Sequence, residues 1–157
     1  KALNDGFYPL TTYAIKSSST FTFFEGLIEA LEKAKMPKVS FISDPWLEID
    51  MLDYLSPNIL MDEEGELLEY IENKLSIGDL VRKGIVKIND SYIYKISLEF
   101  GGFETSLIEQ FRADFNDDGI EDIFVRGWTR ATMGTMGFGF TTILTKLSEK
   151  HLIEKEL

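Results

Sequence analysis

The sequence predicts an α+β fold in a single domain over residues 1–157, with helices mainly in the N-terminal half and an antiparallel β-meander in the C-terminal half. Apolar residues recur at helical spacing up to about residue 75, whereas from Ile85 onward they alternate with polar residues. No low-complexity linker divides the chain, and 157 residues of which 44% are hydrophobic are enough to bury one core.

Two helices with a strand between them are predicted in the first third of the chain. Residues 17–20 precede an apolar pattern at helical spacing that Pro37 closes, which predicts a helix over 21–35. The pattern consists of Phe24, Leu27, Ile28 and Leu31. The apolar run 39–42 predicts a short strand. Asp44 before Pro45 predicts the cap and first residue of a helix, which continues through Trp46, Ile49, Leu52 and Leu55.

Two further helices are predicted before the sheet begins. One is amphipathic and has acidic residues near its N-terminus; its apolar positions are Leu67, Leu68, Ile71 and Leu75. Ser76 and Asp79 have the spacing of a capping box, and Gly84 suits the end of the short helix that such a box would begin.

The C-terminal half is predicted to consist of consecutive antiparallel strands. The run 85–88 and the alternating residues 92–100 predict a β-hairpin, with the turn at Asn89 and Asp90. The further strand candidates are 105–112, 121–130, 138–147 and 151–156.

Side chains with oxygen atoms that can bind a metal recur where the strand candidates 105–112 and 121–130 are joined. They follow the pattern D-x-N-x-D-G-x-x-D. Asp114, Asn116 and Asp118 fall at loop positions one, three and five, the Ile120 carbonyl at seven, and Asp122 at nine. Such ligands favour Ca²⁺ over zinc or copper. The sequence therefore predicts a calcium loop that joins two strands, with calcium as the cofactor.

The loop is not that of an EF-hand, because position twelve is Val125 instead of a bidentate glutamate. It resembles the calcium loops of the FG-GAP and VCBS repeat families, in which the same pattern leads into a hydrophobic strand. The resemblance covers about residues 111–126 and implies the same five ligands. A propeller is not expected, because the chain has no second copy of the motif. The alternative is an acidic turn that binds no metal.

The acidic charge is concentrated in one segment. The chain has a net charge of −11, and residues 44–79 hold eleven acidic side chains against the single base Lys74. This composition disfavours nucleic acid as a partner and favours a basic protein. Its candidate contact residues are Glu63, Glu64, Glu66 and Glu69. The alternative is a solvated acidic surface that maintains solubility.

A second candidate contact surface lies on the strand after the loop. Alternation places Arg126, Trp128 and Arg130 on one face together with Phe124, and arginine and tryptophan often dominate binding energies. The alternative is a sheet face whose arginines pair with carboxylates across the strands. The nearby run 134–139 contains three glycines without a phosphate-loop signature, which favours close strand packing or a mobile loop.

Known catalytic motifs are absent from the sequence, and we expect a protein without enzymatic activity. His151, the only histidine, lies near the C-terminal end, and there is no cysteine. A carboxylate-dependent hydrolase is the remaining enzymatic alternative, with Asp117 and Glu121 as its candidates.

The combined features favour a non-catalytic calcium-binding protein that contacts a partner protein, such as an acidic bacterial immunity protein that blocks a toxin or enzyme. The alternative is a secreted or surface module that calcium stabilises and that mediates adhesion or binds carbohydrate through Trp128 and tyrosine residues. Calcium favours an extracytoplasmic location, periplasmic or secreted, over the cytoplasm. No apolar stretch is long enough for a membrane span, and the start at Lys1 suggests that a segment upstream has been removed.

Overall fold

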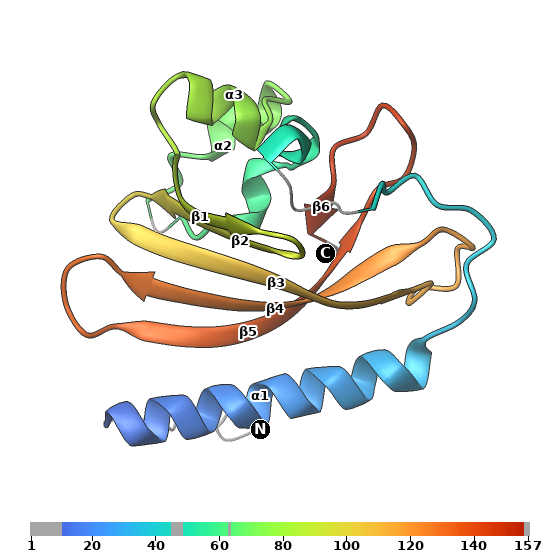
Figure 1. Ribbon diagram of the computed structural model, residues 1–157, viewed down its shortest axis with the longest axis horizontal. Coiled ribbons are helices and arrows are strands. Elements are labelled where there is room, and N and C mark those ends of the chain that lie inside the picture. Colours follow the sequence, from blue (N-terminus) through green and yellow to red (C-terminus); the bar gives the residue numbers. More distant parts are fainter. Residues whose placement is uncertain (1–10, 45–48, 63, 156–157) are drawn as a thin grey trace.

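The computed structural model describes residues 11–44, 49–62 and 64–155. It shows an antiparallel sheet with one long helix along one face and a layer of short helices on the other (Figure 1). The elements, with η for a 3-10 helix, are α1 (Thr12–Lys33), η1 (Ile49–Tyr54), η2 (Pro57–Ile59), α2 (Leu68–Glu72), α3 (Ile77–Arg82), β1 (Lys87–Tyr92), β2 (Lys95–Phe100), β3 (Phe103–Ala113), β4 (Asp122–Ala131), β5 (Gly137–Thr145) and β6 (Glu154–Lys155).

The six strands form one sheet in the order β1-β2-β3-β4-β5-β6, and each pairs antiparallel with its neighbour in the chain. This confirms the predicted α+β class and the C-terminal meander, since the helices of the described residues all precede β1. The last strand is shorter than the predicted 151–156, because only two of its residues pair with β5.

The predicted hairpin turn at Asn89 and Asp90 is wrong. The register passes from Ile88 opposite Leu98 to Asp90 opposite Ser97, so that Asn89 is the extra residue of a β-bulge inside β1. The chain instead turns at residues 93–94, where Tyr94 has a φ of 62°. A bulge accommodates a turn-forming residue while strand pairing continues on both sides of it.

Helix α1 begins nine residues before the predicted start at residue 21, and its N-cap is Thr11, whose hydroxyl accepts a hydrogen bond from the Ala14 N–H. The helix packs along β5, and small residues lie where the two approach most closely. A side chain at Gly26 would collide with Thr141, and one at Gly139 of β5 would collide with Ser19. These glycines therefore allow a close helix–strand approach.

Most of the apolar residues of α1 that contact the sheet are not those whose spacing predicted the helix. Phe23, Leu27 and Ala30 pack against a cluster of aromatic residues on β3, β4 and the loop between them. Of the four residues in the sequence pattern, Leu27 alone belongs to this cluster, and Phe24, Ile28 and Leu31 are more than half exposed. Helical spacing identified the helix, but not the face that the sheet covers.

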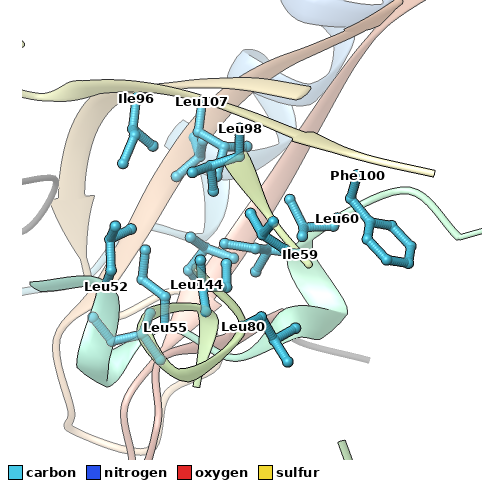
Figure 2. Packing of buried hydrophobic residues seen from close by; sticks show 14 of the residues in the cluster. Leu52, Leu55, Ile59, Leu60, Leu80, Ile96, Leu98, Phe100, Leu107 and Leu144 are labelled. Atoms are coloured by element: carbon cyan, nitrogen blue, oxygen red, sulfur yellow. The ribbon is translucent and has the colours of Figure 1, made fainter. Parts of the chain in front are cut away.

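The main core lies between the other face of the sheet and the short helices. Leucine and isoleucine side chains from both layers are buried there (Figure 2); the labelled ones are Leu52, Leu55, Ile59, Leu60, Leu80, Ile96, Leu98, Leu107 and Leu144. Backbone hydrogen bonds join the layers as well, because the Ser56 N–H donates to the Ile153 carbonyl and the Ile153 N–H to that of Tyr54. The helical layer is thus held at the β6 edge of the sheet.

The short elements of this layer follow their local sequence signals in part. The capping box of Ser76 and Asp79 is confirmed, with both reciprocal hydrogen bonds present, and Gly84 follows the C-cap with a φ of 73°. The backbone N–H of Ser76, followed by the guanidinium of Arg82, lowers the pKa of Asp79 to about 2.

Three predicted elements of the N-terminal half differ from the structure. The run 39–42 is not a strand, because only Val39 makes a β-bridge there. Pro45 and Trp46 lie outside the described residues, and the segment that follows them is the 3-10 helix η1. The helix predicted around residues 67–75 is confined to Leu68–Glu72, which is a little more than one turn.

Candidate calcium loop and interaction surfaces

The predicted calcium loop joins the end of β3 to the start of β4, as expected from the sequence. Asp114 and Asp122, at its two ends, are buried, whereas Asn116 and Asp118 are exposed. The carboxylate of Asp114 accepts hydrogen bonds from the N–H groups of Asp117 and Gly119, at 2.7 and 2.9 Å. The first predicted ligand therefore also organises the loop backbone.

The other predicted ligands make similar short-range hydrogen bonds. Asn116 Oδ1 accepts from the Asp118 N–H, Asp118 Oδ1 from the Ile120 N–H, and Asp122 Oδ2 from the Phe115 N–H. Such bonds between an Asx side chain and a backbone N–H nearby are typical of tight loops. The backbone turns with positive φ at Asp117, 66°, and at Gly119, 86°.

A segment that follows α1, residues 35–42, covers the loop, and we call it the covering segment. Lys35 exchanges two backbone hydrogen bonds with Asp114, and the N–H groups of Lys38 and Val39 both donate to the Gly119 carbonyl. The Lys35 ammonium forms an ion pair with Asp117, which lowers the pKa of this carboxyl through a hydrogen bond and through its charge. The loop is thus fixed by a segment that lies far from it in the sequence.

The loop residues fit calcium by their chemistry. All predicted ligand atoms are oxygens, and two of the three carboxylates are buried, where a negative charge costs free energy that a cation would offset. Among the residues that the structure describes, no three Asp, Glu, His or Cys side chains are grouped closely enough to hold a metal ion. The residues that would hold the ion are Asp114, Asn116, Asp118, the Ile120 carbonyl and Asp122, and the ion would neutralise their carboxylates.

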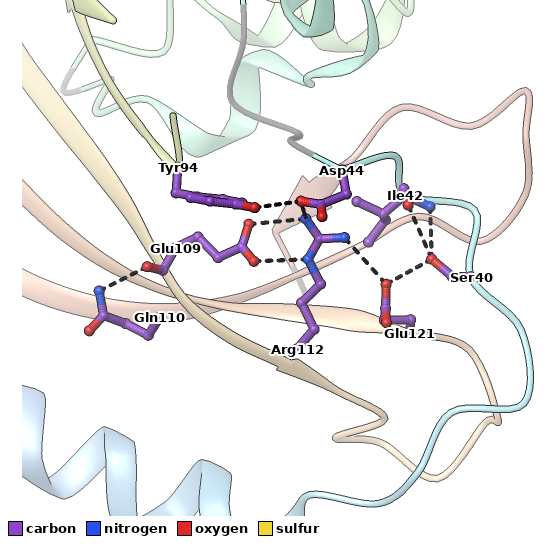
Figure 3. Close-up of polar contacts among 8 residues, drawn as sticks. All are labelled: Ser40, Ile42, Asp44, Tyr94, Glu109, Gln110, Arg112 and Glu121. Atoms are coloured by element: carbon purple, nitrogen blue, oxygen red, sulfur yellow. Dashed lines mark hydrogen bonds and ion pairs between the residues drawn. The ribbon is translucent and has the colours of Figure 1, made fainter. Parts of the chain in front are cut away.

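An arginine near the loop makes a network that the sequence did not indicate (Figure 3). Arg112 of β3 forms a bidentate pair with Glu109 at 2.9 and 3.2 Å and also lies 3.3 Å from Asp44 and 3.6 Å from Glu121. The Tyr94 hydroxyl donates to the same Asp44 carboxylate at 2.9 Å. No motif could have revealed this network, because its members come from separate segments of the chain.

The network joins the covering segment to the sheet and to the loop. Ser40, in the covering segment, donates a hydrogen bond of 2.7 Å to Glu121 at the end of the loop. Burial alone would lower the pKa of Arg112, but the surrounding carboxylates, Glu109 foremost, outweigh it and raise the pKa. The side chain of Arg112 is only 15% exposed, and its positive charge compensates the negative charges of the carboxylates around it.

The two hydrolase candidates are engaged with different partners. Asp117 is mostly exposed and pairs with Lys35, whereas Glu121 is largely buried and contacts Ser40 and Arg112. Both carboxylates therefore have structural roles in this loop.

The predicted stripe on β4 lies on the face of the sheet that carries α1. Phe124, next along this face, packs against α1, while Ile123 and Val125 point into the main core. The guanidinium of Arg126 lies 4.8 Å from the centre of the Phe23 ring, and Arg130 pairs with Glu104 across the strands at 3.0 Å. The pairing of Arg130 corresponds to the alternative interpretation of the stripe.

Trp128 lies between two adjoining hollows on this face. One, of about 560 Å³, extends toward the N-terminal end of α1 and the β4–β5 turn; the other, of about 480 Å³, extends over β1 and β2. Glu104, Trp128 and Arg130 line both, and we call them together the sheet cleft. Gly137 leaves room for the indole, because a Cβ there would lie 3.1 Å from it.

The acidic candidates lie on the helical layer, on the opposite side of the sheet, with Glu63 outside the described residues. The carboxylate of Asp62 accepts hydrogen bonds from three consecutive N–H groups, 65–67, and so fixes the turn before α2. Leu67 then anchors this turn in the core, and Leu68 is 62% exposed. The exposed glutamates of this turn and of α2, which we call the acidic surface, are Glu64, Glu66, Glu69 and Glu72.

Comparison with protein-family models, with curated proteins and with solved structures finds no match. The likeness to FG-GAP and VCBS loops therefore rests on the loop residues alone. In the described part of the chain, no helix combines the length and the apolar composition that a membrane span requires.

Proposed function

We propose that this protein is a non-catalytic interaction protein, stabilised by calcium, that binds a basic partner protein through its acidic surface. The proposal rests on which side chains surround the four glutamates of this surface. In the described residues, none of them lies within ion-pair distance of a basic side chain. Many acidic side chains elsewhere in the fold do have such partners; they are Asp44, Asp53, Asp79, Asp90, Glu99, Glu104, Glu109, Asp117 and Glu121.

The acidic surface also has an apolar centre. Leu68 and Glu72 are one turn apart on α2 and Glu69 lies beside them, so the exposed leucine is flanked by carboxylates. An apolar contact within a charged rim is the usual anatomy of a protein interface. The negative charges would steer a basic partner to this side of the molecule. An acidic inhibitor, such as a bacterial immunity protein that blocks a toxin or enzyme, acts in this way.

Calcium has a structural role in this proposal. Bound by the loop ligands, it would neutralise the carboxylates between β3 and β4 and hold that hairpin in register. A loop with few carboxylates binds calcium weakly, so millimolar calcium occupies it more readily than submicromolar calcium does. We therefore infer an extracytoplasmic location, periplasmic or secreted.

Neutralising the acidic surface is expected to weaken partner binding about tenfold or more, mainly through slower association. The variant replaces Glu64, Glu66, Glu69 and Glu72 with Gln. Its matched control loses the same charge elsewhere, through Gln at Glu25, Glu29, Glu149 and Glu154. A partner captured from extracts of the native organism would be purified, and its rates measured against both variants at low and high salt. Equal affinity of the two variants for that partner would refute the proposed surface.

The sheet cleft supports a second candidate function, carbohydrate binding. Trp128 offers an aromatic surface, and the polar side chains around it, including Asn89, Glu104 and Arg130, can exchange hydrogen bonds with hydroxyl groups. If this function is correct, a glycan array will give signals that Trp128→Ala abolishes and the exposed control Met133→Ala retains. An array without signals for the wild-type protein would exclude it for the glycans present.

A further inference from the structure

The sheet cleft follows a row of residues that crosses the sheet on the face that carries α1. Helix α1 packs along β5, whereas β1 and β2 lie at the other edge of the sheet (Figure 1). The strand register sets four residues opposite one another from β1 to β4, namely Asp90, Ser97, Ser106 and Trp128. Neighbouring strands lie about 4.8 Å apart, so the row is about 14 Å long. All four residues line the hollow over β1 and β2, which we call the second hollow.

Trp128 ends this row in a position that two glycines of β5 allow. A Cβ at Gly137 would lie 3.1 Å from the six-membered ring of the indole, and a Cβ at Gly139 would lie 3.3 Å from it. The ring therefore rests against both glycines, where a larger residue would push it aside. Trp128 is partly exposed and lines both hollows, so the rest of the indole is open to a ligand.

Two serines next to the indole line the second hollow. Ser97 is only 2% exposed, and its hydroxyl oxygen lies 2.6 Å from that of Ser106. One of these hydroxyl groups donates to the other, and the second can donate its own proton to a ligand. Because serine is small, the row is deep beside the large side chain of Trp128. A hollow of about 480 Å³ with a buried polar pair suits a ligand that accepts hydrogen bonds.

The charged side chains around the serines are paired with one another. Lys95 lies 3.0 Å from Asp90, and Arg130 lies 3.0 Å from Glu104. The side-chain amide of Asn89 also donates to Glu104, at 2.9 Å. A charged ligand would have to compete with these ion pairs. Hydroxyl groups can instead join the hydrogen bonds without separating the charges, because a hydroxyl both donates and accepts.

We propose that the sheet cleft binds an uncharged oligosaccharide of at least three units, which crosses Trp128 with one sugar ring against the indole. This proposal rests on carbohydrate binding, the second candidate function of the protein. The hollows on the two sides of Trp128 have volumes of about 560 and 480 Å³. Each is within the range of small-ligand sites, about 300–1,000 Å³. Each hollow therefore holds at least one unit besides the ring at the indole.

Isothermal titration calorimetry tests the length of the ligand, with neutral chains of glucose, mannose and N-acetylglucosamine from one to about six units as probes. The series that binds best is expected to gain at least about tenfold in affinity between one and three units, because the added units enter the two hollows. Trp128→Ala should abolish binding at every length. A single unit that binds as tightly as three units would refute the extended site and leave carbohydrate binding itself intact.

The variant Ser106→Leu tests the second hollow, because it adds an apolar side chain there and removes a hydroxyl group. Chains of three units should bind this variant at least about tenfold more weakly than the wild-type protein. The control Gln110→Leu adds a leucine to an exposed position of the same strand, outside the cleft, and should bind like the wild type. Unchanged circular dichroism and thermal unfolding would show that both variants fold. Wild-type affinity of Ser106→Leu would overturn the proposal.

Acidic chains test the charge of the ligand. Lys16 of α1 is exposed and lines the hollow of about 560 Å³, so an acidic sugar would contact this side chain. Oligogalacturonate of the same lengths is expected to bind at least about tenfold more weakly than the best neutral series. Equal or tighter binding of oligogalacturonate would overturn the proposal of an uncharged ligand. If none of the chains binds, carbohydrate binding itself is refuted, and this proposal with it.

Discussion

Removal of calcium with EDTA is expected to lower the unfolding temperature of this protein by about 5 to 10 °C relative to the protein in millimolar calcium. A ligand that binds only the folded state at one hundred times its dissociation constant stabilises that state by about 2.7 kcal/mol. For a chain of this length, 1 kcal/mol corresponds to about 2 to 4 °C. Differential scanning calorimetry in the two buffers measures the shift.

The reason for this effect lies in the loop between β3 and β4. Asp114 and Asp122 are buried there, and their negative charges oppose folding unless a cation or hydrogen bonds compensate them. The backbone N–H groups that donate to these carboxylates provide part of the compensation. Calcium would provide the rest and would link the two strands that form the centre of the sheet.

The variant Asp118→Ala separates calcium binding from loop folding. The Asp118 side chain is exposed and accepts a hydrogen bond from the Ile120 N–H alone among the described residues, so the loop should retain its fold without it. We expect this variant to lose the calcium-dependent shift, whereas the control Asp117→Ala should keep it, because Asp117 is outside the ligand set. A calcium shift that persists in Asp118→Ala, or is absent from the wild-type protein, would reduce the motif to an acidic turn.

Replacing Arg112 with Leu is expected to destabilise the fold by about 3 kcal/mol. The change leaves the carboxylates of Glu109, Glu121 and Asp44 close together without the cation that they surround, and breaking such a buried pair has a cost of this size. Asp44, which lies just after the covering segment, would also lose its ion pair with β3. Urea denaturation measures the change in the free energy of unfolding.

Two further variants identify the origin of this effect. Arg130→Gln removes an ion pair whose arginine is 59% exposed, and it should cost less than about 1 kcal/mol. Adding Glu109→Leu to Arg112→Leu should recover part of the lost stability, because it removes an acid that the first change left unpaired. If Glu109→Leu lowers the stability of the Arg112→Leu protein as much as it lowers that of the wild-type protein, the network does not act as a unit.

The sequence alone predicted the features of this fold that depend on neighbouring residues. The alternation of apolar residues predicted the antiparallel meander, the spacing of Ser76 and Asp79 predicted the capping box, and the position of the acidic loop between two strands followed from its flanking residues. These features could be predicted because backbone geometry and short-range hydrogen bonds determine them.

The tertiary structure decided the features that depend on residues far apart in the chain. The face of α1 that the sheet covers is set by the close approach of Gly26 and Ser19 to β5, and helical periodicity contains no information about that neighbour. The partners of Arg112 come from separate segments, as does the segment that covers the loop. Shape complementarity and ion pairing act through space, so only the folded chain shows which residues they bring together.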